Sequence, residues 1–154
     1  MDRHPDSVVA YKDDYIVWLE QQRDALRQRA FDRLDLMNLI GELELTVQSN
    51  KHEVHSRLRV IMLDLLKCEF QPQRQSRSWL RTLKVQREEL EYLLDDSPSL
   101  RHLLPEFTLI DYRRAVNDAV RETGLQRTQL PGQNPYTVEQ LLDPEFVPQK
   151  GDFT

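Results

Sequence analysis

The sequence contains one cysteine, four glycines and no long hydrophobic run. The single cysteine, Cys68, excludes a disulfide within the chain and fits a reducing compartment, so we expect a cytoplasmic protein. No apolar run approaches the roughly 20 residues of a membrane-spanning helix. The first ten residues also lack the basic start and apolar stretch of a secretion signal. We therefore expect neither secretion nor contact with a membrane.

Sequence patterns of common enzyme and nucleotide-binding sites are also missing. The chain has no Gly-x-Gly-x-x-Gly fingerprint, no Walker sequence and no serine between glycines. His52 and His55 lie three residues apart, but zinc proteases of the common type use a spacing of four, and no third ligand is evident. We expect no catalytic residue, no metal and no cofactor, and an enzyme of this sequence would be unconventional.

The residues that are present favour helices. Glycine is scarce and alternating Val/Ile/Thr runs are absent, which opposes sheet formation. A length of 154 residues is typical of one domain. We predict an all-α, single-domain bundle of about five main helices spanning residues 1–154. Residues 1–12 are expected to be flexible, and residues 125–150, which are rich in proline, to form an ordered arm packed over the bundle.

Apolar residues recur every three or four positions in five segments, which predicts five helices. Asn50 followed by Glu53 has the character of a capping box, so the second and third helices are expected to be separate. Pro105 predicts a kink or break in the last helix. The second helix is expected to bury a stripe formed by Leu36, Leu39, Ile40, Leu43 and Val47. The expected helices cover residues 14–29, 35–49, 50–71, 76–95 and 97–124.

The net charge of −5 is unevenly distributed along the chain. Residues 1–50 carry six basic and ten acidic side chains, residues 51–87 nine and three, and residues 88–154 six and thirteen. The plainer interpretation is that the acidic flanking segments fold back against the basic middle segment. The sharper one is that the basic segment forms a surface for a partner.

Two groups of polar residues are candidate interaction sites. Asp35, Asn38 and Glu42 share one polar stripe of the second helix, opposite its leucines, where they could join a neighbouring helix, hold a cation or remain solvated. The second group, Arg77, Arg81 and Lys84, shares a face of the fourth helix. It could contact phosphate, but the acidic chain as a whole favours a solvated basic face, and Trp79 is expected to point toward the core.

Arg87 is expected among the leucines of the fourth helix. A buried guanidinium needs a carboxylate and further hydrogen bonds, and Glu44, at the edge of the second helix's apolar stripe, is the candidate partner. The alternative is that Arg87 lays its stem over the leucines and extends its head into water.

The chain resembles, over nearly its full length, a family of uncharacterised bacterial proteins catalogued as domain of unknown function number 29. It departs from the family pattern at Asp64 and Cys68, where histidine and tryptophan are usual. The resemblance implies a helical fold and no particular activity. It is carried by Asp13-Asp14-Tyr15 with Trp18, Asp35-Leu36, Asn38-Leu39-Ile40, Leu65-Leu66-Lys67, Gln71-Pro72, Ser78-Trp79, Gln86-Arg87, Ser97-Pro98-Ser99-Leu100, Glu122-Thr123-Gly124 and Pro135-Tyr136-Thr137.

The function predicted from these observations is a non-catalytic protein-interaction module or adaptor in the bacterial cytoplasm, such as the neutralising partner of a two-protein system. Its partner is expected to be another protein or a second copy of the chain. The alternative is a nucleic-acid-associated regulator that uses residues 51–87, which the acidic net charge disfavours. An unrecognised enzyme is the third alternative.

Overall fold

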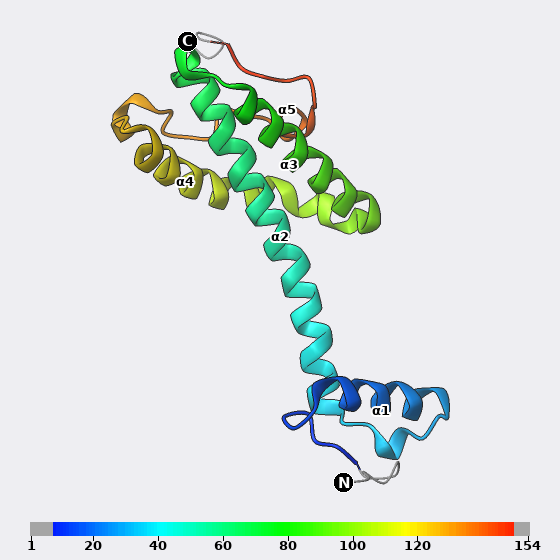
Figure 1. Cartoon of the computed structure of the whole chain (residues 1–154). Helices are drawn as coiled ribbons and strands as arrows, with labels where there is room; N and C mark the ends of the chain where they lie inside the picture. Colours follow the sequence, from blue (N-terminus) through cyan, green and yellow to red (C-terminus); the bar gives the residue numbers. More distant parts are fainter. Residues whose placement is uncertain (1–7, 150–154) are drawn as a thin grey trace. The chain divides into compact units, whose positions relative to one another are not determined.

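The computed structural model describes residues 8–149, which contain helices and turns and no strand (Figure 1). The prediction of an all-α fold is therefore confirmed. Short 3₁₀ turns lie between the α-helices, the longest of them at Pro98–Leu103. The α-helices of the described residues are α1 (Tyr15–Arg27), α2 (Leu36–Phe70), α3 (Arg77–Asp96), α4 (Leu104–Thr123) and α5 (Val138–Leu142).

Local chemistry explains where most of these helices begin and end. Asp14 before α1 and Ser76 before α3 each accept a hydrogen bond from the backbone N–H three residues further on. Thr137 and Gln140 form a reciprocal capping box at the start of α5. Gly124 ends α4 with a φ of 73°, a left-handed conformation that glycine adopts without steric cost.

Helix α2 differs from the prediction because it continues through residues 49 and 50 without a break. The expected separation into two helices is wrong. A serine and an asparagine can cap a helix, but neither blocks one in the way proline does. Residues 42–71 contain no proline and no glycine, so the backbone hydrogen bonds can continue.

The helix expected over residues 97–124 is interrupted next to Pro105, as predicted. The 3₁₀ turn at Pro98–Leu103 leads directly into α4, and Pro105 lies in the first turn of that helix. A proline fits there because the first backbone N–H groups of a helix have no partner within the helix.

The chain divides into two compact units, residues 1–48 and 49–154, of which residues 8–48 and 49–149 are described. The second unit has a contiguous apolar core, to which the second half of α2 contributes more of the fully buried side chains than any other helix. The other core residues come from α3, α4 and the segment after α4. The largest fully buried side chains of this unit include Leu58, Ile61, Met62, Leu65, Leu66, Leu90, Leu94, Leu104 and Leu141.

The segment after α4 packs on this core, which confirms the predicted arm. Leu130, Tyr136 and Leu141 are buried in it. The Tyr136 hydroxyl donates a 2.9 Å hydrogen bond to the Glu69 carboxylate, and the Tyr112 hydroxyl of α4 donates a 2.6 Å hydrogen bond to the carbonyl oxygen of residue 131. Residue 150 of the predicted arm lies outside the described residues.

Candidate interaction surface

A polar network joins α1 to the start of α2 in the first unit. The indole N–H of Trp18, which is 1% exposed, donates a 3.1 Å hydrogen bond to Asp35 Oδ2. Asn38 donates to the same oxygen at 2.8 Å, and the backbone N–H of Asp35 donates to Gln22 Oε1 at 2.7 Å. The hydrogen bond from Asn38 lowers the pKa of Asp35. Asp35 therefore does more than cap α2, because it also holds an α1 side chain against it.

Glu42, two turns further along α2, extends this network. Its carboxylate accepts hydrogen bonds from the hydroxyls of Tyr11 (2.6 Å) and Tyr15 (2.7 Å), and these bonds lower the pKa of Glu42. The ring of Tyr11 packs edge-to-face on Trp18, with 4.9 Å between the ring centroids. The backbone N–H of Val9 also donates to α1, at Gln21 Oε1. Residues 1–7, the other part of the segment predicted to be flexible, lie outside the described residues.

The structure thus brings the predicted residues Asp35, Asn38 and Glu42 together on one side of α2, facing α1. The carboxylate of Asp35 accepts hydrogen bonds from the side chains of Trp18 and Asn38, and that of Glu42 accepts from tyrosine hydroxyls. Of the three possibilities for this stripe, the geometry is that of an interhelical network. Residues 8–149 contain no group of three or more His, Cys, Asp or Glu side chains able to hold a metal ion.

Because α1 contacts the polar side of α2, the apolar side of the same turns is exposed. Leu36, Ile40, Leu43 and Val47 are 59%, 53%, 68% and 55% exposed, and we call these four residues the α2 stripe. Their expected burial is wrong. Helical spacing shows that apolar residues share a face, but it does not show which face a neighbouring helix covers.

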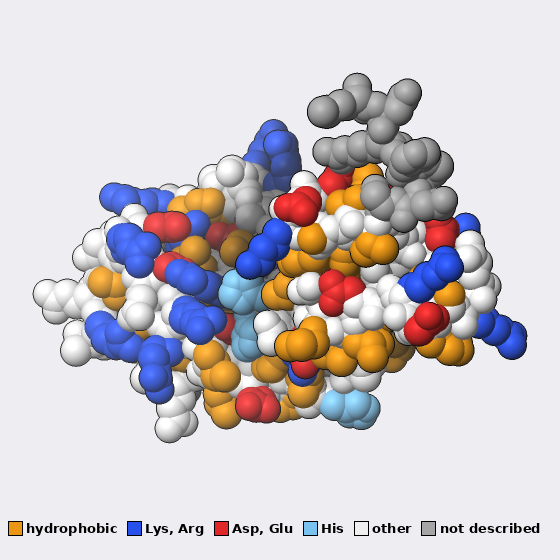
Figure 2. Space-filling model, turned by 90° about the horizontal axis from the view of Figure 1, so that it is seen from below, with side chains coloured by type: hydrophobic (Ala, Val, Ile, Leu, Met, Phe, Trp, Pro, Cys, Tyr) orange, Lys and Arg blue, Asp and Glu red, His pale blue; other side chains and the backbone are white. Residues whose placement is uncertain are grey.

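The surroundings of the α2 stripe are apolar and acidic. Met37 is 87% exposed and Glu44 is exposed beside the stripe. Residues 36–48 contain two glutamates and neither lysine nor arginine. Figure 2 shows one face of the molecule, where hydrophobic side chains reach the surface in neighbouring groups with acidic and basic side chains among them. Along residues 36–48 the only charged side chains are the two glutamates, so the α2 stripe is accompanied by negative charge.

The predicted basic face lies on α3 in the second unit, where Arg77, Arg81 and Lys84 are exposed. Lys84 lies 3.8 Å from Glu88, whereas the two arginines form no ion pair with a described residue. Trp79 is half-buried, and the Lys67 ammonium lies 4.8 Å from its ring centroid. The ring is thereby occupied, which leaves it poorly placed to stack on a base.

Part of the basic segment is neutralised by the acidic C-terminal segment, as the plainer interpretation of the charge pattern predicts for that one of the two acidic flanks. Arg59 Nη2 donates to Asp118 Oδ1 at 2.7 Å, and Lys67 Nζ lies 3.2 Å from Glu122 Oε2. The hydrogen bonds from Arg59 lower the pKa of Asp118. Fewer cations are consequently left for an external polyanion.

Arg87 is 3% exposed, but its partners are not those expected. Its guanidinium donates 2.9 Å hydrogen bonds to the backbone carbonyl oxygens of Gln140 and Leu141 in α5. Glu44, the expected partner, is exposed on α2. Carbonyl oxygens at the end of a short helix lack partners within the helix, so they can satisfy a buried guanidinium. Sequence patterns record side-chain types and give no sign of such backbone acceptors.

Sequence reasoning also missed a pair between α2 and α4, formed by a partly exposed histidine and a buried aspartate. His55 Nδ1 lies 2.7 Å from Asp111 Oδ2, and the imidazole stacks on Phe107 with 3.7 Å between ring centroids. Asp111 is fully buried, and this burial raises its pKa despite the contact with His55. The only indication in the sequence that Asp111 is buried is its spacing of four residues from both Phe107 and Ala115, which places the three side chains on one face of the helix.

These features define a class of protein: an all-helical chain that turns an apolar helix face outward beside an internal polar network. The chain belongs to the family described as Domain of unknown function DUF29, whose model matches residues 10–147. No curated protein and no solved structure matches it. No helix in the described part of the chain is long and apolar enough to cross a membrane.

Proposed function

We propose that this protein is a non-catalytic interaction module of the bacterial cytoplasm, and that it binds another protein through the α2 stripe. The main observation behind the proposal is that the first turns of α2 direct their polar side toward α1 and their apolar side toward solvent. Their carboxylates face α1, while Leu36, Ile40, Leu43 and Val47 face outward. A contiguous exposed apolar face of this kind marks interaction sites in soluble proteins.

The α2 stripe has the spacing of a helix-binding seam. Its residues are separated by four, three and four positions, which is the pattern that inserts side chains between those of a second helix. Burying each of these side chains would contribute about 1 kcal/mol or more, at ~25 cal/mol per Å² of apolar surface. Four adjacent side chains supply a specific hydrophobic anchor.

The charge of this unit favours a basic amphipathic helix of another protein as the occupant. Residues 1–48 carry six basic and ten acidic side chains, and residues 36–48 have no positive charge of their own. A second copy packed stripe against stripe would place glutamates near glutamates, which opposes self-association. A helix with lysine or arginine beside its apolar face would pair with Glu44.

The test uses the full chain with a photo-crosslinking amino acid in place of Met37, beside the α2 stripe. Proteins captured in the native host are identified, and each is then purified and titrated against the unlabelled chain. We expect a direct partner whose crosslinked segment is a basic amphipathic helix. The Ile40→Ser plus Leu43→Ser variant should weaken its binding at least tenfold.

The matched control is Tyr92→Ser, which removes a side chain that is 72% exposed on α3. It should leave the affinity unchanged. Equal binding by the stripe variant and the unmodified chain would contradict the proposal. Sedimentation that shows a dimer abolished by Ile40→Ser plus Leu43→Ser would assign the surface to a second copy instead.

A further inference from the structure

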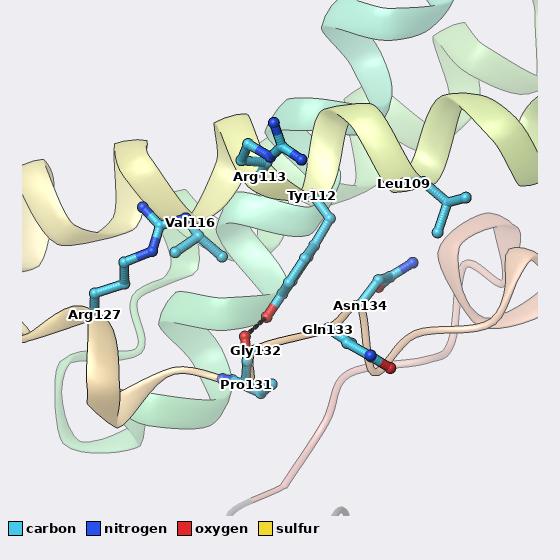
Figure 3. Close-up of a pocket in the computed structure, with 9 residues that line it drawn as sticks. All are labelled: Leu109, Tyr112, Arg113, Val116, Arg127, Pro131, Gly132, Gln133 and Asn134. Carbon is cyan, nitrogen blue, oxygen red and sulfur yellow. Dashed lines mark hydrogen bonds between the residues drawn. The ribbon is translucent and has the colours of Figure 1, made fainter.

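The second unit contains a pocket that is separate from the α2 stripe. A cavity of about 540 Å³ lies between α4 and the arm (Figure 3). This is within the size range of small-molecule sites, about 300–1,000 Å³. Its lining comprises Leu109, Tyr112, Arg113, Val116, Arg127, Pro131, Gly132, Gln133 and Asn134.

One wall of the pocket is apolar and fixed. In Figure 3 the side chains of Leu109 and Tyr112 extend from α4 toward the arm. The Tyr112 hydroxyl donates to the backbone carbonyl of Pro131 at 2.6 Å, which ties the arm to α4 and holds the wall in place. Leu109 is 70% exposed whereas Tyr112 is 5% exposed, so the leucine and the Pro131 ring offer a ligand more apolar surface than the tyrosine does. Such a wall suits a flat apolar group.

The charge of the pocket is positive and uncompensated. Arg113 and Arg127 line it, no carboxylate does, and neither arginine forms an ion pair with a described residue. Arg127 donates to the neutral Asn117 side chain at 2.6 Å, which orients the guanidinium without cancelling its charge. Most other arginines of this unit with defined contacts face carboxylates, as Arg59, Arg101 and Arg114 do.

An amide adds a directed donor. Asn134 accepts a 3.0 Å hydrogen bond from the backbone N–H of Tyr136 through its Oδ1. The Asn134 NH₂ group therefore remains to donate to a bound molecule, since no described residue accepts from it.

We propose that this pocket binds a small organic anion whose carboxylate or phosphate contacts Arg127 and Arg113 and whose flat apolar part lies against Leu109, Tyr112 and Pro131. The arginines supply charge-assisted hydrogen bonds, and the apolar wall supplies burial of surface. The two parts together select amphipathic anions over inorganic ions and over neutral aromatic molecules.

The test is an NMR titration of the ¹⁵N-labelled full chain with phenyl phosphate, benzoate, inorganic phosphate and benzyl alcohol. We expect saturable shifts of the Arg127, Gly132 and Asn134 amides with phenyl phosphate or benzoate. The stronger of these two identifies the acidic group. Inorganic phosphate and benzyl alcohol should each bind at least tenfold more weakly than the stronger aromatic anion.

The Arg113→Gln plus Arg127→Gln variant should weaken binding of that anion at least tenfold. Arg121→Gln is the matched control, because Arg121 is exposed on the same helix, lies outside the pocket and pairs with Asp118. It should bind like the unmodified chain. The proposal is overturned if neither aromatic anion shifts the pocket amides, if the double variant binds as well, or if either comparison molecule binds as tightly.

Discussion

The indole N–H of Trp18 on α1 donates to the carboxylate of Asp35, the residue immediately before α2. This 3.1 Å bond is one of several contacts that hold α1 against the polar face of α2, together with the hydrogen bonds of Glu42 to Tyr11 and Tyr15. A tryptophan normally packs against apolar side chains, but this one also needs an acceptor when its N–H is buried. The acceptor lies on the polar side of α2, so α1 packs there and the leucines of α2 face outward.

Trp18→Ala should destabilise the first unit by about 3–5 kcal/mol, because it removes a buried aromatic side chain and leaves a cavity. Trp18→Phe should have a smaller effect, since it keeps most of the ring and loses the donor. Hydrogen exchange of the α1 amides measures the change. Ile16→Ala, on the same helix and 61% exposed, should stay within about 0.5 kcal/mol. Unchanged protection in Trp18→Ala would show that α1 is not held by this side chain.

The α1–α2 contact should weaken in acid. Hydrogen bonds lower the pKa of Asp35 and Glu42 in the folded state, so their stabilising effect is present above the unfolded pKa values of about 4. It is lost as the pH falls through the lower folded values. The Trp18 indole resonance should be constant between about pH 7 and 5 and change below about 4. Glu42→Gln should make that change shallower, and an identical profile would contradict the assignment.

Arg87→Met should destabilise the second unit by about 2 kcal/mol or more, because two carbonyl oxygens of α5 lose their donor. Amides of residues 138–142 should lose protection from hydrogen exchange. Arg87→Lys should recover only part of the stability, since an ammonium lacks the planar fork of a guanidinium.

Glu44→Gln provides a further test of the Arg87 partners. Chemical denaturation of the two single variants and the double variant should give effects that add within about 0.5 kcal/mol. A coupling free energy well above that value would show that Arg87 and Glu44 interact, as helical spacing had suggested.

Lys51→Pro distinguishes one continuous helix from two. In the continuous α2 this proline removes an internal hydrogen bond and clashes with the preceding turn, so it should cost about 3 kcal/mol or more. In a helix that began after Asn50, proline would occupy the favoured first position and be tolerated. Lys51→Ala is the control for loss of the charged side chain. Circular dichroism during thermal unfolding measures both variants, and equal stability would indicate a break at residue 50.

The exposed arginines of α3 should not bind nucleic acid measurably at physiological salt. Arg77 and Arg81 are available, but other cations of the basic segment, such as Arg59 and Lys67, face carboxylates. Fluorescence anisotropy with labelled RNA and DNA oligonucleotides tests this expectation. Submicromolar affinity that loses part of its salt dependence in Arg77→Ala plus Arg81→Ala would favour a nucleic-acid-associated function instead.

The sequence by itself determined the helical class, most helix ends and the ordered arm. These follow from local causes: the spacing of leucines, caps such as Ser76 and Thr137, the left-handed glycine at 124, and proline in the first turn of α4. The continuity of α2 was not predicted, because Asn50 and Glu53 have the spacing of a capping box although no helix begins at Asn50.

Only the tertiary structure decided which faces meet. Asp35, Asn38 and Glu42 were identifiable as one stripe, but their contact with Trp18 and the tyrosines depends on where α1 lies. Arg87 was recognisable as buried, whereas its acceptors are backbone oxygens that exist at every residue and leave no mark in a sequence. The sequence of a helix determines the directions of its side chains. Which other helix packs against each face depends on the free energy of the whole packed unit.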